Sequence, residues 1–81
     1  PMSTVSSVLV CREVQAVLDA SPLFDLRGLS VEEESPGCLA IRGMVGSFYH
    51  KQLAQEAVRA VAKQLDYRVV NYVEVMDALI N

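Results

Sequence analysis

The chain has 81 residues, of which 52% are hydrophobic and 21% charged, and its net charge at pH 7 is −3. This size and balance predict one small globular domain with a single core. An acidic chain gains nothing from neutralising phosphates, so nucleic acid and anionic membrane surfaces are disfavoured partners.

No apolar run reaches the roughly 20 residues of a membrane span, so no transmembrane segment is predicted. No basic segment followed by an apolar run marks a secretory signal. We therefore expect a cytoplasmic protein, with the periplasm or envelope as the alternative if a further segment precedes this sequence.

Cysteine and histidine are scarce in this chain. The two cysteines, Cys11 and Cys38, are expected to be free thiols, because a non-secreted domain without a dense cysteine framework seldom forms a bridge. A structural zinc site needs about four Cys or His ligands, and the chain has only one histidine. No metal site and no cofactor are predicted.

The first predicted element is a helix from about residue 4 to residue 20. Ser3 or Thr4 can cap it, and Ser21-Pro22 ends it because the residue before proline avoids the helical region. A strand is the competing interpretation for its first turns, where β-branched residues are frequent. The apolar stripe expected to face the core comprises Val5, Val8 or Leu9, Val14, Val17 and Leu18.

Two strands are predicted next. The first runs from about Leu26 to Glu33, with Leu29 and Val31 alternating with polar residues. The acidic run Glu32–Glu34 and Ser35-Pro36-Gly37 then form a turn, and we interpret the three carboxylates as a solvated strand end. The second strand, Cys38–Val45, alternates throughout.

At Ser47 the apolar period changes from two to between three and four, which predicts a helix over Ser47–Leu65 with Ser47 as its N-cap. Its stripe comprises Ala54, Ala57, Val58, Val61 and Leu65. A third strand follows at Arg68–Val75, and residues 76–81 are a short tail.

The element order predicts an α+β fold, α-β-β-α-β, in which two helices pack on one face of a three-stranded mixed sheet. The single domain spans residues 1–81, with its core in about residues 26–75. The two strands that flank the second helix should be parallel. The predicted core comprises Leu39, Ile41, Val45, Ala57, Val61, Val69 and Val73.

Three stretches follow the pattern of a known family. Gly37 lies in the turn between the first two strands, and Ile41–Val45 fits the pattern L-x-G-x-V. The second helix has a leading serine and spaced alanines, and Val69–Val75 fits V-x-N-x-L-x-V. In these features residues 26–75 resemble the BON domain, a module named from bacterial osmotically induced and nodulation proteins.

The resemblance implies a bacterial, non-enzymatic module that binds a protein partner or a phospholipid surface, with no catalytic residues. Two residue choices also have a physical interpretation. Gly43, in mid-strand, indicates a bulge or the close approach of a helix. Asn71, on an otherwise apolar strand face, needs a hydrogen-bond partner if it is buried.

The sheet face that the helices leave open is the candidate interaction face. Its centre is apolar, its edges are charged, and tyrosine and methionine are typical of contact surfaces. We expect this face to bind a protein partner or a second copy of the chain; the alternative is that Arg42 and Tyr72 cover its apolar groups and it stays hydrated. The candidate residues are Ala40, Arg42, Met44, Val70 and Tyr72.

Two other functions have weaker support. Gly43–Gly46 reads G-x-x-G, the loop with which KH domains clamp a nucleic-acid backbone, but its middle residues are apolar and the chain is acidic. An enzyme would have to use Ser47, His50 and a carboxylate, and no oxyanion site is indicated. Ser47 is better explained as a helix cap and His50 as a surface residue.

Overall fold

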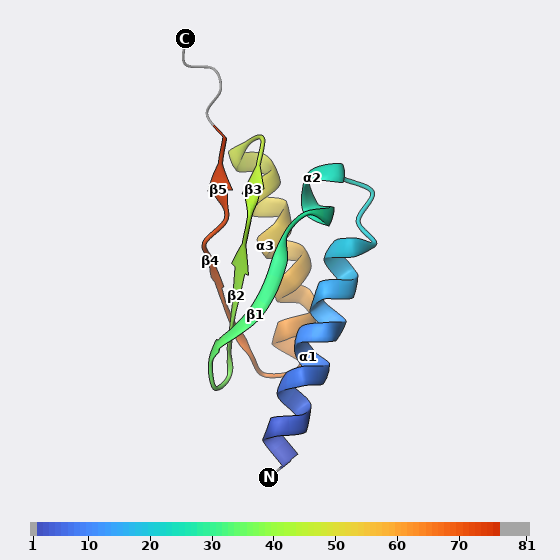
Figure 1. The fold of residues 1–81 in the computed structure, drawn as a ribbon, viewed down its shortest axis with the longest axis vertical. Helices are drawn as coiled ribbons and strands as arrows, with labels where there is room; N and C mark the ends of the chain where they lie inside the picture. Colours follow the sequence, from blue (N-terminus) through green and yellow to red (C-terminus); the bar gives the residue numbers. More distant parts are fainter. Residues whose placement is uncertain (1, 77–81) are drawn as a thin grey trace.

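The computed structural model describes residues 2–76 of the chain, and side chains for residues 8–76. Figure 1 shows a sheet on one side of the molecule and two long helices on the other. The elements, in chain order, are α1 (Met2–Asp19), α2 (Phe24–Arg27), β1 (Ser30–Ser35), β2 (Cys38–Arg42), β3 (Met44–Val45), α3 (Phe48–Gln64), β4 (Arg68–Asn71) and β5 (Glu74–Val75).

The predicted α+β fold is confirmed: helices pack on a three-stranded mixed sheet of order β1-β2-β4. β1 and β2 are antiparallel and β2 and β4 are parallel, as expected for the strands that flank α3. A second, two-stranded sheet pairs β3 with β5, also in parallel.

The strands expected at Cys38–Val45 and Arg68–Val75 are each interrupted, but one ladder connects them. Ile41 pairs with Asn71 in the first sheet and Met44 pairs with Glu74 in the second, so the register is unchanged across the break. Between them the N–H of Glu74 donates to the carbonyl of Gly43 at 2.9 Å. Gly43, with φ of +139°, marks the interruption.

The first strand begins later than predicted, because residues 24–27 form the short helix α2. Leu26 and Leu29, which are 3% and 2% exposed, are three residues apart. That spacing is helical rather than the period of two of a strand, so the expected strand over Leu26–Glu33 is wrong in its first half. β1 begins opposite Arg42, and α2, which precedes it in the chain, lies close to β3.

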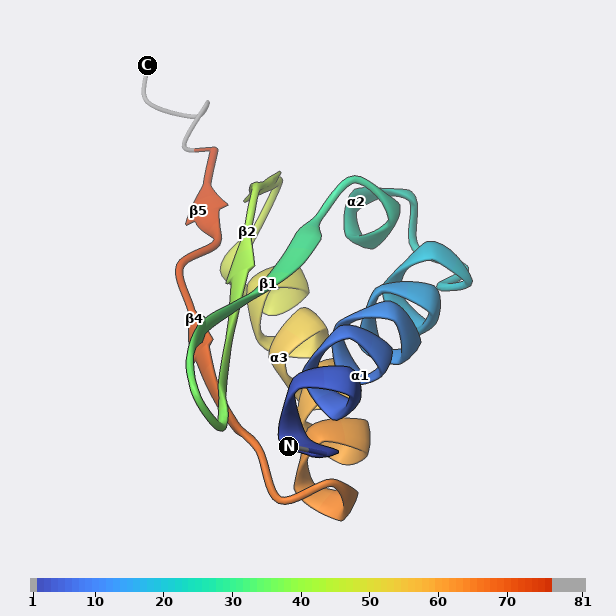
Figure 2. The ribbon, with the colours of Figure 1, turned by 60° about the horizontal axis from the view of Figure 1, so that its bottom comes forward.

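Both long helices cover one face of the sheet, which Figure 2 shows from below. Leu39 and Ile41 of β2 point into the layer between them and are fully buried. The helices contribute one buried residue at each turn. These residues are Val10, Val14 and Leu18 on α1 and Ala54, Val58 and Ala62 on α3.

The predicted core is correct at four residues of the predicted strands and partly wrong on α3 and β4. Leu39, Ile41, Val45 and Val73 are buried, but Ala57, Val61 and Val69 are only half-buried. The buried line of α3 is rotated towards α1, against which it packs. Leu65, expected in the stripe, is instead the exposed C-cap residue, and Val8 and Leu9 of α1 are also exposed.

Two local predictions are confirmed. Ser47 is the N-cap of α3, since its Oγ accepts the backbone N–H of His50 at 3.1 Å. Half-buried Asn71 has the partners it needs: its Nδ2 donates to the carbonyl of Lys51 at 3.1 Å, and its Oδ1 accepts the N–H of Val73. Asn71 therefore ties β4 to α3.

The beginning of α1 differs from the prediction, because the helix starts at Met2 and Ser3 and Thr4 lie within it. The expected inward position of Val5 and the tail beyond Met76 lie outside the described side chains. Within residues 2–76, no helix combines the length and apolar character needed to cross a bilayer.

Candidate functional site

The open face of the sheet carries an ordered polar layer. The Arg42 guanidinium lies over the ring of Tyr72, 4.5 Å from its centroid, and its Nε donates to a carboxylate oxygen of Glu32. The Tyr72 hydroxyl donates to Oε2 of Glu34 at 2.8 Å. Glu32 and Glu34 of β1 thus bind Arg42 of β2 and Tyr72, which directly follows β4.

These contacts alter the titration of both central side chains. The hydrogen bond to Glu32 raises the pKa of Arg42. The hydrogen bond to Glu34, together with some desolvation, raises the pKa of the Tyr72 phenol. Both shifts favour the cationic guanidinium and the protonated phenol, the forms that make these hydrogen bonds.

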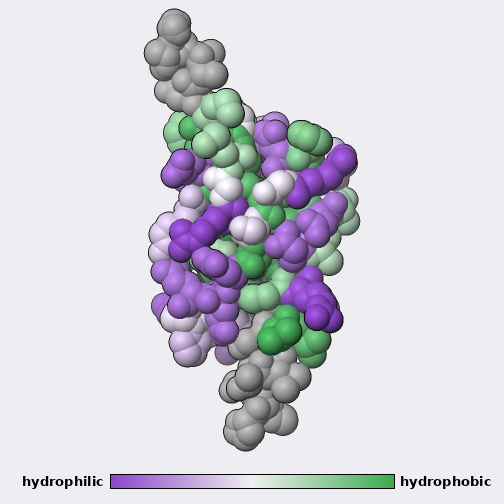
Figure 3. All heavy atoms as spheres, in the orientation of Figure 1, coloured by the Kyte–Doolittle hydropathy of each residue, from purple (hydrophilic) through white to green (hydrophobic). Residues whose placement is uncertain are grey.

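Of the five candidate interaction residues, the structure brings Arg42 and Tyr72 into direct contact. Ala40 is fully buried between Glu32 of β1 and Val70 of β4, and Val70 is half-buried. The expected apolar centre is therefore largely covered by its own polar neighbours. Figure 3 shows hydrophilic side chains over this part of the sheet.

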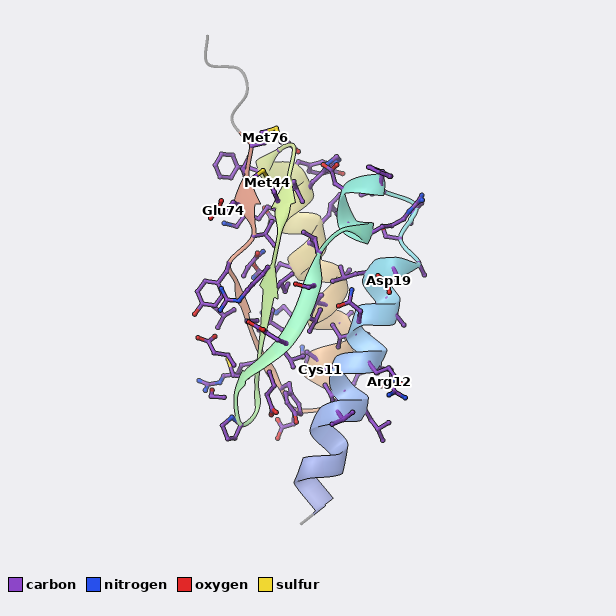
Figure 4. All side chains as sticks on the ribbon, in the orientation of Figure 1. Cys11, Arg12, Asp19, Met44, Glu74 and Met76 are labelled. Atoms are coloured by element: carbon purple, nitrogen blue, oxygen red, sulfur yellow. The ribbon has the colours of Figure 1, made fainter. Side chains whose placement is uncertain are left out.

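Met44 belongs to a different environment, the end of the molecule where α2, β3, β5 and the start of α3 meet (Figure 1). It is 50% exposed, and it lines a shallow pocket of about 370 Å³ together with Phe24. Figure 4 shows Met44 and Met76 close together at this end. The N–H of Met76 donates to the carbonyl of Val45 at 2.8 Å, which fixes β5 beside β3.

Five exposed large side chains lie at this end, which we call the apolar end. Phe24 and Met44 line one pocket, and Phe48 lines another, between α3 and β4. Its most exposed members are Phe24 of α2, at 80%, and Phe48 in the first turn of α3, at 75%. Large apolar side chains in such a group, rather than singly, are typical of contact surfaces. The apolar end comprises Phe24, Met44, Phe48, Tyr49 and Met76.

A hydrogen-bonded pair holds the apolar end together. Nδ1 of His50 lies 2.8 Å from Oδ2 of Asp25, and the same oxygen accepts the N–H of Gly46 at 2.8 Å. The hydrogen bond to His50, followed by that to Gly46, lowers the pKa of Asp25. One carboxylate thus connects α2 to both the β3–α3 turn and the first turn of α3.

This pair supplies the carboxylate that an enzyme built on Ser47 and His50 would require. However, the Ser47 hydroxyl is occupied with the backbone N–H of His50 as a helix cap, and Gly46 N–H is occupied by Asp25. A nucleophile needs a base that reaches its oxygen and a free oxyanion donor, so these contacts favour a structural role.

Among the described side chains, no group of three or more His, Cys, Asp or Glu residues is arranged to hold a metal ion. Comparison with protein-family models, curated proteins and solved structures finds no match to this chain.

Sequence reasoning identified only Met44 of the apolar end. Phe24 lies between the first predicted helix and the first predicted strand, and Phe48 and Tyr49 lie outside the predicted apolar stripe of the second helix. The available signal was the concentration of aromatic residues: Phe48 and Tyr49 are consecutive at a helix start, where neither fits the buried stripe. The partner of His50 had no local signal, because Asp25 is 25 residues away.

Proposed function

We propose that this chain is a non-enzymatic binding module of BON type that attaches to a protein partner through its apolar end. The observation that carries the proposal is the exposure of Phe24, Phe48 and Tyr49 together with two methionines at that end. Aromatic residues and methionine are enriched in the buried centres of protein interfaces. Five such side chains exposed at one end would be an aggregation liability without a partner.

Charge favours a protein over a bilayer. Two carboxylates, Asp25 and Glu74, lie at the same end as the apolar residues, beside the cation Arg27, and the chain as a whole is acidic. An anionic membrane would repel both. The cytoplasmic location expected from the sequence stays a prediction and is compatible with a protein partner.

The sheet face supports a weaker proposal, self-association of two copies. Arg42 and Tyr72 already have partners within the chain, so a second copy would have to displace or cover a satisfied polar layer. Covering such groups without new hydrogen bonds costs free energy. At the apolar end the Arg27 guanidinium lies over the Phe24 ring, 5.9 Å from its centroid, but it leaves Phe24 80% exposed. The apolar end is therefore the better contact surface.

The KH-like alternative has no support from the Gly43–Gly46 segment. Met44 and Val45 form strand β3, Val45 is 2% exposed, and the N–H of Gly46 is bound to Asp25. A phosphate-clamping loop needs its backbone free to approach the nucleic acid.

The test is site-specific photo-crosslinking in the source cell. A photoreactive residue at position 48, in the apolar end, should capture one protein partner, whereas the same residue at position 9, which is exposed on α1, should not. Equal capture at both positions contradicts the proposal. Flotation with phosphatidylcholine vesicles that is lost in Phe24→Ser with Phe48→Ser would make phospholipid the target instead.

Light scattering tests the remaining alternative, self-association of two copies through the sheet face. The wild type should be a monomer. A dimer that dissociates in Met44→Glu with Tyr72→Glu, but not in Phe24→Ser with Phe48→Ser, would move the contact to the sheet face.

A further inference from the structure

Four of the chain's seven Lys and Arg residues line one side of this acidic molecule. Three of them, with Gln55, follow α3 at intervals of four residues, which places them along one side of the helix. None of the four forms an ion pair within the described part of the chain. They are Lys51, Arg59, Lys63 and Arg68.

These side chains border a groove between α3 and β4. It consists of two hollows of about 510 Å³ and 340 Å³ that share Gln55. Val69 and Asn71 of β4 form its other wall, and two carboxylates, Asp66 and Glu56, also line it. The cations outnumber the carboxylates by four to two, so the groove is basic. We call it the edge groove.

β4 is an outer strand of the three-stranded sheet. The N–H groups of Arg68 and Tyr72 donate to β2, at 2.8 Å and 2.9 Å. Because alternate residues of a parallel strand turn their backbone groups to opposite sides, Val69 and Asn71 direct theirs away from β2, towards the edge groove. Such a row of backbone donors and acceptors is a template for another strand.

We propose that the edge groove binds an extended acidic segment of a partner protein, which adds to the sheet beside β4. Main-chain hydrogen bonds to Val69 and Asn71 would hold its backbone, and the cations of α3 and Arg68 would receive its carboxylates. From Lys51 to Lys63 the helix rises about 18 Å. That length accommodates about five or six extended residues.

A second copy of the chain is a poorer occupant, although β1 carries three consecutive glutamates. Glu32 and Glu34 are engaged with Arg42 and Tyr72 on the sheet face. The outer edge of β1 is also partly capped, because Oε1 of Gln15 accepts the N–H of Val31 at 3.0 Å. The edge groove meets the apolar end at Phe48, which lines the smaller hollow. The proposal uses only the cations of the groove and the backbone of β4, so it does not depend on the function proposed above.

The test is a nitrogen-15 NMR titration of the full chain with a six-residue peptide of alternating glutamate and valine. The amides of Val69 and Asn71 should shift. A peptide with lysine in place of glutamate, and the acidic peptide N-methylated at alternate bonds, should both bind at least tenfold more weakly. Arg59→Glu should weaken binding of the acidic peptide about tenfold, while Arg12→Glu, the same charge change on α1, should not.

Four results would overturn the proposal. One is the absence of shifts in β4 up to about 1 mM peptide. Another is equal binding of the lysine peptide, and a third is an equal loss in Arg59→Glu and Arg12→Glu. The fourth is a change in the amide signals of Val69 and Asn71 with protein concentration in the absence of peptide. Such a change would mean that a second copy of the chain occupies the edge groove.

Discussion

Gly43 lies directly against Leu29: a Cβ atom added at Gly43 would be 2.6 Å from Cδ2 of Leu29 and 3.4 Å from its Cα. Leu29 is 2% exposed and leads from α2 into β1. The glycine thus lets the chain after α2 close over the junction of β2 and β3. The sequence predicts a bulge or the close approach of a helix at this glycine; the close neighbour is instead Leu29, in the segment between α2 and β1.

Gly43→Ala should therefore destabilise the protein. The positive φ of +139° disfavours any side chain, at a cost of about 1–3 kcal/mol, and the contact with buried Leu29 adds to it. Gly28→Ala is the matched control, because Gly28 has φ of −93° and a Cβ there meets nothing within 4 Å. It should change the free energy of unfolding by about 0.5 kcal/mol or less in denaturant melts. Equal effects of the two substitutions would contradict the role given to Gly43.

Ile41→Ala should lower the free energy of unfolding by about 2–5 kcal/mol, the usual cost of truncating a large core residue. Ile41 is fully buried in the central strand, against the helices. Leu65→Ala removes the same number of carbon atoms from the exposed C-cap of α3 and should cost about 1 kcal/mol or less. Urea melts of both variants measure the difference. A near-neutral Ile41→Ala would mean that β2 has the wrong face towards the helices.

The contact between Asp25 and His50 predicts a pH dependence. Since the hydrogen bond to His50 and then that to Gly46 lower the pKa of folded Asp25, this group stabilises the fold above its unfolded pKa of about 3.9. The stabilisation is lost as pH falls through the lower, folded value. Asp25→Asn should reduce the melting temperature at pH 6 and flatten its fall in acid. Glu13→Gln, the same loss of charge at an exposed site on α1, should leave the acid profile nearly unchanged.

The two cysteines should react slowly in the folded protein. Both are free thiols, as predicted, and Cys38 is buried. Burial, with smaller contributions from Glu33 and Glu32, raises the pKa of the half-buried Cys11 thiol, so little thiolate is present at neutral pH. Alkylation followed by mass spectrometry should show two modified thiols quickly in urea and slowly without it. Fast native labelling of Cys11 would contradict its position against β1.

Periodicity predicted most of this fold because the central elements have clear periods. β2 alternates and is buried, and Ser47 marks the change to α3 with a hydroxyl that caps it. Periodicity failed at α2, where one helical turn is too short to establish a period and Leu26 and Leu29 fit either structure over so few residues. It also misjudged the rotation of α3, because Ala54, Ala57, Val58 and Val61 are all apolar and only packing against α1 selects among them.

The candidate site was harder to predict than the fold. Arg42 and Tyr72 were assigned to one face correctly, but whether a charged side chain covers an apolar neighbour depends on partners far away in the sequence. Glu34, which holds Tyr72, is 38 residues from it. The apolar end joins Phe24, Met44 and Phe48 from three elements, and their proximity follows from the position of α2, which the sequence pattern did not reveal.

The central claim is that the apolar end binds a protein partner. The most direct measurement is a calorimetric titration of that partner, once photo-crosslinking has identified it and it has been purified without the crosslink. It is titrated with the wild-type chain and with two double variants. Phe24→Ser with Phe48→Ser should weaken binding at least tenfold, because exposed aromatic anchors carry much of the energy of a protein interface. Val8→Ser with Leu9→Ser, which removes two exposed apolar side chains from α1, should bind like the wild type. All three should have similar unfolding free energies. Unchanged affinity in the Phe24 and Phe48 variant, or an equal loss in both variants, would contradict the account.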